Sequence, residues 1–478
     1  MRQRITFIQE PQDSLDPQRL QIGKNSIATQ DLKAAREDRI TLSLDELPQE
    51  LYQYLQVSTF SGILKGVATA RRTSHTPALL RADLYSGLLC PTLKTIFGDL
   101  DCISPEQSFT TLPNDRFSHS SPYAFFQPLE SVEYLHEYIK HKFCQEVHSD
   151  CLERVVALLA ASSVDIDFDT ISHALIITAF SPPQSRSISL SNKIPKDRME
   201  VGILSVESPK EPEELSLGGF LTVVGEDAKA SPTLFSFPAR HHPVSAVFSA
   251  SFLYPTGLHP TLELKISSSA PPTDERTCSL HTHLTLPRSI FADRYQLSDP
   301  LFIASKNISA LHHITNTVDL EAPTYTLNVW GSSLLLELAP PSTPSSFTAQ
   351  IPLHLRYLPP TPSGKSKLKI PYPVVFWACV ADEGSKFPIN PFDRVNIGYD
   401  GLFGPKTMFY HLSPGVETLF IEVSVPVLES DKSDYVESGT AGVVVLGFMW
   451  VLWCLFRVWR RHGYGSSGVA VVDNKKKL

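Results

Sequence analysis

Aspartates alternate with apolar residues at two places in the chain. Asp165, Asp167 and Asp169 form one run, and Asp99 and Asp101 form a shorter one. In some glycosyltransferases an Asp-x-Asp pattern binds a metal ion together with a sugar nucleotide, so Asp165 and Asp167 are candidate catalytic residues. The same spacing also arises on the polar face of a strand or in a solvated turn. We favour this second interpretation.

Two pairs of histidines are candidate metal ligands. His281 and His283 alternate, so on a strand both would lie on one face. His241 and His242 are adjacent in the sequence. A zinc site needs at least three protein ligands, and neither pair has a third ligand at a plausible spacing. We therefore expect surface or half-buried histidines, with no metal site and no cofactor.

The other catalytic motifs that we considered are incomplete or missing. Gly364-Lys365-Ser366 resembles the end of a phosphate-binding loop, but Pro359 stands where the first glycine is required. The sequence contains neither a Gly-x-Ser-x-Gly elbow nor a His-Glu-x-x-His motif. The chain therefore carries no convincing active site, which favours a protein that is not an enzyme.

Six of the seven cysteines lie upstream of an apolar C-terminal segment, and Cys454 lies within it. An even number permits three disulfides, whose connectivity the sequence cannot give. No Cys-x-x-Cys pair suggests a metal site, and scattered buried thiols remain an equal alternative. The candidate disulfide cysteines are Cys90, Cys102, Cys144, Cys151, Cys278 and Cys379.

The apolar segment Ser438–Phe456 is uncharged. Its length of about 28 Å as a helix is close to the roughly 27 Å hydrocarbon thickness of an endoplasmic reticulum bilayer. Trp450 and Trp453 lie toward its basic end, where aromatic side chains favour a membrane interface. We expect a transmembrane helix here; the alternative is a buried helix of a soluble domain.

Charge on the two flanks of this segment is opposite. Acidic residues such as Asp434 and Glu437 precede it, whereas Arg457, Arg460 and Arg461 follow it. Because Lys and Arg near a membrane helix prefer the cytosol, we expect a lumenal body and a cytosolic tail. The first residues lack the apolar core of a secretory signal, so translocation would depend on the C-terminal segment or a helper. The alternative is a tail-anchored protein with a cytosolic body.

Two short signals fit this topology. Lys475 and Lys476 stand fourth and third from the end, like the di-lysine retrieval signal of endoplasmic reticulum membrane proteins. A basic tail attracted to anionic lipid is the alternative. Asn307-Ile308-Ser309 is an N-glycosylation acceptor that would be used only if it is lumenal.

Composition and periodicity define the body. Hydrophobic residues are 42% and charged residues 19%, so the body is globular. The net charge of −8 argues against nucleic acid as a partner. Leu129–Ala161 is rich in helix formers, with a break near His148, and Ala174–Phe180 is typical of a buried strand. The charged, proline-containing stretch from Ser208 to Glu214 predicts a surface loop or linker.

Downstream of this stretch the sequence turns to short strands. Leu262–Ile266 and Leu419–Val425 alternate apolar and polar residues, and Ser333–Leu338, Ala349–Tyr357 and Pro373–Val380 are further β-type runs. We predict a mixed α+β N-terminal region followed by an all-β antiparallel sandwich-like lumenal domain. The expected parts are residues 1–205 (N-terminal region), 206–239 (linker and connecting segment), 240–430 (β-rich domain), 438–456 (transmembrane helix) and 457–478 (basic cytosolic tail).

Six short motifs follow one another in the C-terminal half. They are Leu286-Pro287, Asp293–Leu297, Asp319–Pro323, Ile351–Tyr357, Pro373–Cys379 and Asn390–Tyr410. No single motif is diagnostic, but their order and spacing are similar to those of the PIG-X family, and closely so to its fungal, protease-B-nonderepressible members. The family-like domain covers roughly residues 240–430, and the fungal likeness extends over the whole chain.

The resemblance implies an accessory role. PIG-X proteins are non-catalytic subunits of GPI mannosyltransferase I in the endoplasmic reticulum, which transfers the first mannose from dolichol-phosphate-mannose to the acylated precursor. The catalytic partner is a separate multi-spanning protein, which the PIG-X subunit stabilises. Two alternatives remain: a lumenal chaperone for secretory or membrane clients, and a metal-dependent glycosyltransferase that uses Asp165 and Asp167.

Overall fold

The computed structural model describes residues 1–463 with internal gaps, of which the longest fall at 48–88, 112–122, 145–160 and 388–398. The chain divides into two units. The first comprises Met1–Tyr357 with Leu368–Val423, and the second comprises Leu358–Lys367 with Ser424–Leu478. The structure is mostly β, with sandwich-like sheets and one apolar C-terminal helix, which confirms the predicted fold class.

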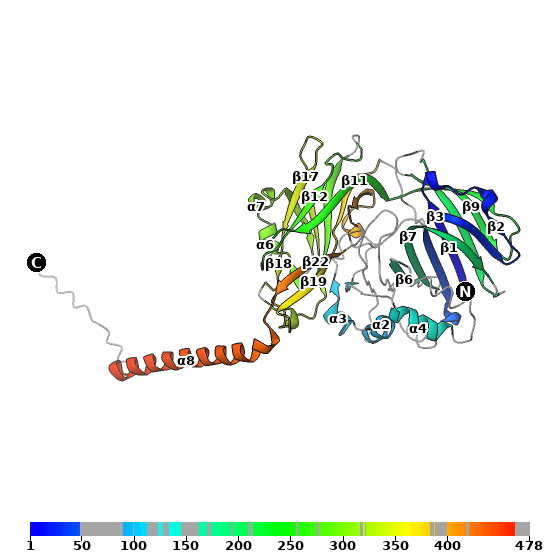
Figure 1. The fold of residues 1–478 in the computed structure, drawn as a ribbon. Helices are drawn as coiled ribbons and strands as arrows, with labels where there is room; N and C mark the ends of the chain where they lie inside the picture. Colours follow the sequence, from blue (N-terminus) through cyan, green and yellow to red (C-terminus); the bar gives the residue numbers. More distant parts are fainter. Residues whose placement is uncertain are drawn as a thin grey trace, which may run out of the picture. The chain divides into compact units, whose positions relative to one another are not determined.

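The N-terminal part of the first unit is built on an eight-stranded sheet (Figure 1). Its strand order is β10-β9-β8-β1-β3-β7-β6, with β2 paired to β3. Only β1 and β8 pair in parallel; the other described pairs are antiparallel. The strands are β1 (Arg2–Gln9), β2 (Gln21–Ile22), β3 (Ser26–Ser43), β6 (Ser163–Asp169), β7 (Ala174–Ser191), β8 (Arg198–Glu207), β9 (Glu214–Val224) and β10 (Ser231–Pro238).

Alternate residues of neighbouring strands gather into an apolar cluster on one face of this sheet. Ile5 and Phe7 of β1 and Val201 and Ile203 of β8 belong to one buried cluster. Within residues 206–239, which we expected to connect two regions, β9 and β10 instead continue this sheet. The predicted loop, Ser208 to Glu214, falls between the end of β8 and the start of β9, and most of its residues lie outside the described part of the chain.

Short helices lie between β3 and β6 in the sequence. Helix α4 (Glu133–Phe143) falls within the expected helical stretch Leu129–Ala161, whose second half lies outside the described residues. Helix α2 (Leu89–Phe97) packs with α4. The remaining elements between β3 and β6 are the 3₁₀ helix η3 (Leu44–Glu46), α3 (Pro105–Ser108), β4 (Thr110–Thr111) and β5 (Tyr123–Ala124). Two further 3₁₀ helices, η1 (Pro11–Asp13) and η2 (Pro17–Arg19), lie between β1 and β2.

A second eight-stranded sheet forms the C-terminal part of the first unit, in the order β15-β16-β13-β20-β21-β11-β12-β17. The antiparallel expectation holds for its pairs except one, because β11 and β21 are parallel. The strands are β11 (His241–Phe252), β12 (Thr261–Ile266), β13 (Cys278–Pro287), β15 (Ile308–Ile314), β16 (Gly331–Leu338), β17 (Phe347–Pro352), β20 (Val374–Val380) and β21 (Thr407–Pro414).

The central strands of this sheet are buried on both faces. Seven consecutive residues of β13, from Leu280 to Leu286, are buried, and six of the seven residues of β20 are buried as well. Smaller elements complete the region: β14 (Ile290–Phe291) pairs with β18 (His354–Leu355), and β19 (Lys365–Pro371) pairs with β22 (Phe420–Pro426). The helical turns are α6 (Arg294–Leu297), α7 (Pro300–Ala304), η4 (Thr324–Thr326) and η5 (Asp400–Leu402).

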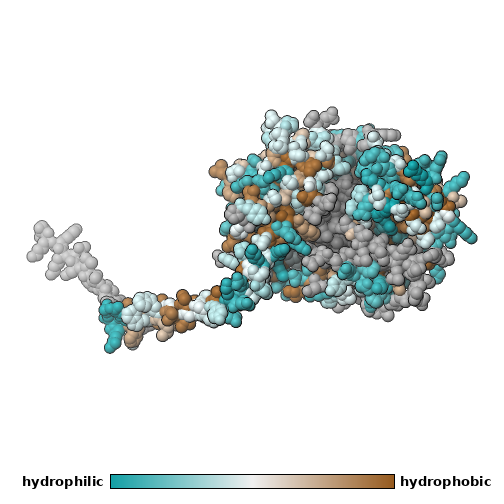
Figure 2. Space-filling view, viewed as in Figure 1, coloured by the Kyte–Doolittle hydropathy of each residue, from teal (hydrophilic) through white to brown (hydrophobic). Residues whose placement is uncertain are grey.

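The second unit contains helix α8 (Ser430–His462), whose 33 residues span about 50 Å. By length and composition it is suited to cross a membrane. Figure 2 shows hydrophilic residues at both ends of this helix and apolar residues between them. A turn at Thr361 holds its start, because the Ser430 N–H donates to the Thr361 carbonyl at 3.0 Å and the Thr361 N–H to the Leu428 carbonyl at 3.0 Å.

Candidate functional site

Three potential metal ligands from three neighbouring strands meet in the C-terminal sheet. They are His281 on β13, His312 on β15 and Glu337 on β16. One ligand atom from each lies within 4.8 Å of the others, and this is the one such group among the described residues. His281 and Glu337 are paired residues in the β13–β16 register, so their side chains lie on the same face.

A β-bulge brings the third side chain to this point. The register between β15 and β16 shifts between Leu311 and His313, so β15 carries an additional residue there. Bulges bend a strand and redirect its side chains. His312 and His313 consequently both line the cavity that His281 and Glu337 also line.

His281 is held rigidly. It is buried, its ring stacks on Phe376 at 5.7 Å between centroids, and Phe403 meets it edge-on at 5.0 Å. Its Nδ1 lies 3.1 Å from the carbonyl oxygen of Ser279. Because a carbonyl only accepts hydrogen bonds, Nδ1 carries the hydrogen and Nε2 keeps its lone pair.

Burial also sets the charge of His281. It lowers the pKa of this imidazole to about 4, and the neighbouring His312 acts in the same direction. The imidazole is therefore neutral near pH 7, roughly three units above that value. A neutral imidazole is the form that binds metal ions.

His312 and Glu337 form the more accessible side of the cluster. His312 Nε2 lies 2.6 Å from Glu337 Oε2, and the two side chains are 39% and 29% exposed. A short contact between an imidazole N–H and a carboxylate is a charge-assisted hydrogen bond. This pair can move more freely than His281 because solvent reaches it.

The cluster borders a cavity of about 320 Å³. Its other walls are mostly apolar, and Leu335, Leu402 and Phe403 are among the residues that form them. Cys379 lines it too and is joined by a disulfide to Cys278, its register partner on β13. The cavity therefore offers one polar wall with metal-ligand chemistry and an otherwise apolar lining.

The two histidines of each pair noted in the sequence have different neighbours in the structure. His283 is buried and its ring lies 5.3 Å from that of Tyr399. His241 Nδ1 lies 3.0 Å from His411 Nε2, whereas His242 Nε2 lies 2.7 Å from the Ala239 carbonyl. Of the four candidate histidines, only His281 belongs to the metal-ligand group found among the described residues.

The aspartate pairs lie in the N-terminal half. Asp165 and Asp167 occupy alternate positions in β6, at one edge of the first sheet, opposite Thr178 and Ile176 of β7. Asp99 lies outside the described residues. Asp101 Oδ2 accepts a hydrogen bond from Arg288 Nη2 at 2.7 Å. Asp101 thus takes part in an ion pair.

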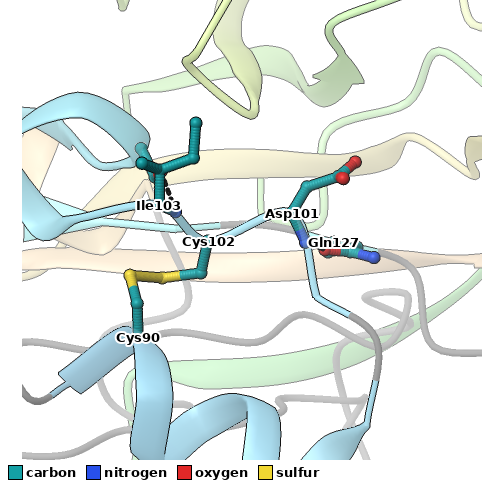
Figure 3. The surroundings of a disulfide bond; sticks show 6 residues. Cys90, Asp101, Cys102, Ile103 and Gln127 are labelled. Carbon is teal, nitrogen blue, oxygen red and sulfur yellow. Dashed lines mark hydrogen bonds between the residues drawn. A yellow bond between two sulfur atoms is a disulfide. The ribbon is translucent and has the colours of Figure 1, made fainter.

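Two disulfides are described. Cys90, in the first turn of α2, is joined to Cys102 (Figure 3), and Cys278 is joined to Cys379. Next to Cys102, the Asp101 N–H donates to Gln127 Oε1 at 2.7 Å, which holds the loop after α2. Cys144 is also disulfide-bonded, and Cys151 lies outside the described residues. Cys454 in α8 is a free thiol.

Asn307 is exposed at the turn between α7 and β15, in a left-handed conformation with φ of 57°. Its Nδ2 donates to the Thr348 carbonyl at 2.7 Å. The amide carries two hydrogens, so one remains for this bond if a sugar replaces the other. Lys475 and Lys476 lie outside the described residues.

His312 and Glu337 were not candidates in the sequence analysis. The only local signal is the His312-His313 pair in a short β-type run. Their proximity to His281 depends on the strand order β15-β16-β13 and on the bulge in β15. Neither can be read from periodicity alone.

The described residues form a β-rich body followed by one C-terminal helix long and apolar enough to cross a membrane, which is consistent with a single-pass membrane protein. Residues 255–456 match the family model described as PIG-X / PBN1. The chain is 46% identical to protein pbn1 of Neurospora crassa over 100% of both chains, and 42% identical to protein pbn1 of Emericella nidulans over 97% of both. Protein PBN1 of Saccharomyces cerevisiae is 27% identical over 54% of this chain and 58% of that protein. The chain belongs to the PIG-X/PBN1 family, whose members are components of GPI-anchor biosynthesis.

Proposed function

We propose that this chain is a non-catalytic, stabilising subunit of the endoplasmic reticulum GPI mannosyltransferase I, which adds the first mannose to the GPI-anchor precursor. The observation that carries the proposal is the 46% identity to a fungal pbn1 protein over the full length of both chains. Its partner is the catalytic, multi-spanning subunit of that enzyme.

The architecture supports this division of labour. A transferase that joins a dolichol-linked sugar to a lipid-linked acceptor needs a surface embedded in the membrane, built from several helices. The described part of this chain contains one helix long and apolar enough to cross a membrane. The chain supplies an extramembrane body and an anchor, and the partner supplies the membrane-embedded chemistry.

The ends of α8 support a lumenal body and a cytosolic tail. Trp450 and Trp453 lie 5.2 Å apart between ring centroids, and the Arg457 guanidinium lies 5.4 Å from the Trp453 ring. Aromatic and basic side chains are enriched at a membrane interface, and basic residues favour the cytosolic side. These contacts support a cytosolic position for the basic end of α8.

Exposed apolar side chains on α6 and α7 suit contact with a partner. Tyr295 is 79% exposed and Leu301 is 85% exposed. Figure 2 shows apolar residues on this side of the domain. The caps Asp293 and Asp299 hold the two helical turns, because they accept hydrogen bonds from the Tyr295 and Leu301 N–H groups at 2.8 and 3.0 Å. We assign this surface to the lumenal loops of the catalytic subunit.

The test is the abundance of the catalytic subunit after this chain is depleted. The proposal predicts that the catalytic subunit falls while unrelated multi-spanning proteins of the endoplasmic reticulum stay constant. Restoring the full chain should restore the abundance of the catalytic subunit. A variant in which an unrelated membrane helix replaces α8 separates the contribution of the body from that of the anchor. An unchanged catalytic subunit would refute the proposal, and a general fall of membrane and secretory proteins would favour a chaperone instead.

A further inference from the structure

We propose that His281, His312 and Glu337 form a binding site for a divalent transition-metal ion, with Zn²⁺ as the preferred ion. This inference goes beyond the proposed accessory function and does not depend on it. It rests on the convergence of the three side chains within 4.8 Å, on the hydrogen bonding of His281 and on the cavity beside them.

The set of ligands is the first argument. Two imidazoles and one carboxylate are a common zinc ligand set, which leaves a fourth position for water or another oxygen ligand. Ca²⁺ and Mg²⁺ prefer oxygen ligands, so a set in which two of the three ligands are histidines disfavours these ions. The chemistry of the side chains therefore selects a borderline metal such as Zn²⁺.

The orientation of His281 is the second argument. Metal-binding histidines usually donate their other ring N–H to a carbonyl or carboxylate, which fixes the tautomer and the ring orientation. His281 does this through Nδ1 and the Ser279 carbonyl at 3.1 Å. Stacking on Phe376 restrains the ring further. One ligand is thus preorganised, with Nε2 available.

The mobility of the other two ligands is the third argument. Tetrahedral zinc with bonds of about 2.05 Å places its ligand atoms about 3.3 Å apart. His312 Nε2 and Glu337 Oε2 are 2.6 Å apart, so this contact must widen and the proton between them must leave. Both side chains are partly exposed, and they can rotate without disturbing the buried core.

The surroundings provide space for the remaining ligand. A bound water needs about 30 Å³, and the adjoining cavity has about 320 Å³. Apolar walls that include Leu335 and Leu402 lower the polarity on the buried side of the site, which strengthens charge interactions there. The ion would also crosslink β13, β15 and β16, and this predicts that metal stabilises the C-terminal sheet.

The experiment measures zinc stoichiometry in the full chain. The protein is purified in detergent through an affinity tag without histidines, treated with a chelator, and titrated with zinc sulfate while bound zinc is measured by mass spectrometry. Cobalt(II) gives a second readout, because four-coordinate cobalt absorbs visible light. The variants are His312→Ala and Glu337→Gln, whose partly exposed positions leave the buried core intact. His242→Gln is the matched control, since this half-buried histidine lies in the same sheet and outside the cluster.

The proposal predicts one zinc per chain in the wild type and in His242→Gln, with loss of that zinc in His312→Ala and Glu337→Gln. The cobalt absorption should follow the same pattern. Zinc should raise the unfolding temperature of the wild type and of His242→Gln, but not that of His312→Ala or Glu337→Gln. Absence of stoichiometric zinc in the wild type would overturn the proposal. Equal binding by the wild type and both cluster variants would overturn it as well.

Discussion

His281 on β13 faces Glu337 on β16 as a register partner, and the bulge in β15 adds His312 to the same point. Three strands distant in sequence therefore build one cluster of metal-ligand side chains. The arrangement lies in the domain that matches the PIG-X / PBN1 family model. The cluster is a candidate metal site within a protein whose proposed role is that of an accessory subunit.

The two described disulfides should differ in their effect on stability. Cys278–Cys379 closes a separation of 101 residues and Cys90–Cys102 one of 12. Chain entropy alone predicts contributions of about 5 and about 3 kcal/mol to the free energy of unfolding. Because Cys379 and Cys102 are both buried, Cys379→Ser and Cys102→Ser form a matched pair.

Urea unfolding of the full chain in detergent measures the difference. Cys379→Ser should lower the free energy of unfolding by about 2 kcal/mol more than Cys102→Ser. Cys454→Ser is the control, because this thiol is free and lies in α8. An equal loss in the two disulfide variants, or the reverse order, would contradict the prediction.

Asn307 should carry a glycan if the body is lumenal. Its exposed Nδ2 retains a hydrogen for the Thr348 carbonyl after modification. Endoglycosidase treatment should increase the gel mobility of the wild type, and Asn307→Gln should abolish the change. Ser309→Ala should abolish it too, whereas Ser309→Thr keeps the acceptor motif and should keep it. Modification of the body by a membrane-impermeant reagent applied from the cytosolic side would contradict lumenal placement.

Acid should weaken the N-terminal sheet through Glu200. Burial alone would raise the pKa of this carboxyl, but hydrogen bonds and charges from Arg4 and Arg2 hold it below its ordinary value of 4.5. The unfolded state therefore binds the proton more readily than the folded state. The stabilisation is present above the unfolded pKa and is lost as the pH falls through the folded pKa.

The variant Glu200→Gln tests this contribution of Glu200 to stability. At about pH 7 the variant should be less stable than the wild type by about 1 kcal/mol, the upper end for accessible ion pairs. The difference should shrink as the pH falls below 4.5. The exposed Glu226→Gln serves as the control and should show no comparable effect. A difference that stays constant from neutral to acid pH would rule out the ion pairs as its cause.

The surface of α6 and α7 should govern contact with the catalytic subunit. A double substitution, Tyr295→Ser with Leu301→Asp, removes two exposed apolar anchors without altering the caps. Recovery of the catalytic subunit with this chain should fall roughly tenfold or more, because each anchor of a protein interface contributes at least about 1 kcal/mol. Tyr134→Ser is a matched control, since Tyr134 is 63% exposed on α4. Equal recovery with all three proteins would show that the contact lies elsewhere.

Local patterns predicted many of the elements. The alternation at Leu262–Ile266 and the apolar run at Pro373–Val380 correspond to β12 and β20. The uncharged segment Ser438–Phe456 lies within α8. The alternating run identified β12 because one of its faces is buried, whereas continuous apolar runs identified β20, which is buried on both faces, and the middle of α8.

Non-local pairing explains what the sequence did not reveal. The buried run ending at Phe180 was predicted, but β7 continues to Ser191 through Pro182 and Pro183. Those prolines fall where the β3–β7 register shifts, a place where a strand tolerates a missing donor. The parallel pairing of β1 with β8 likewise joins distant segments that have no shared local signal.

The candidate site likewise depends on non-local strand pairing. Alternation alone made His281 and His283 candidate ligands, and the lack of a third ligand led us to expect no metal site there. The actual neighbours of His281 are on β15 and β16, and strand order and a bulge determine this. A third ligand could not be identified before the sheet was known, although each of the three residue types is an ordinary metal ligand.

The proposed function is tested most directly by the identity of the GPI precursor that accumulates when this chain is depleted. Cells are labelled with radioactive inositol and the lipid precursors are resolved. The proposed accessory function predicts accumulation of the acylated glucosaminyl lipid that lacks mannose, with recovery on return of the full chain. A normal precursor profile alongside general secretory defects would contradict it.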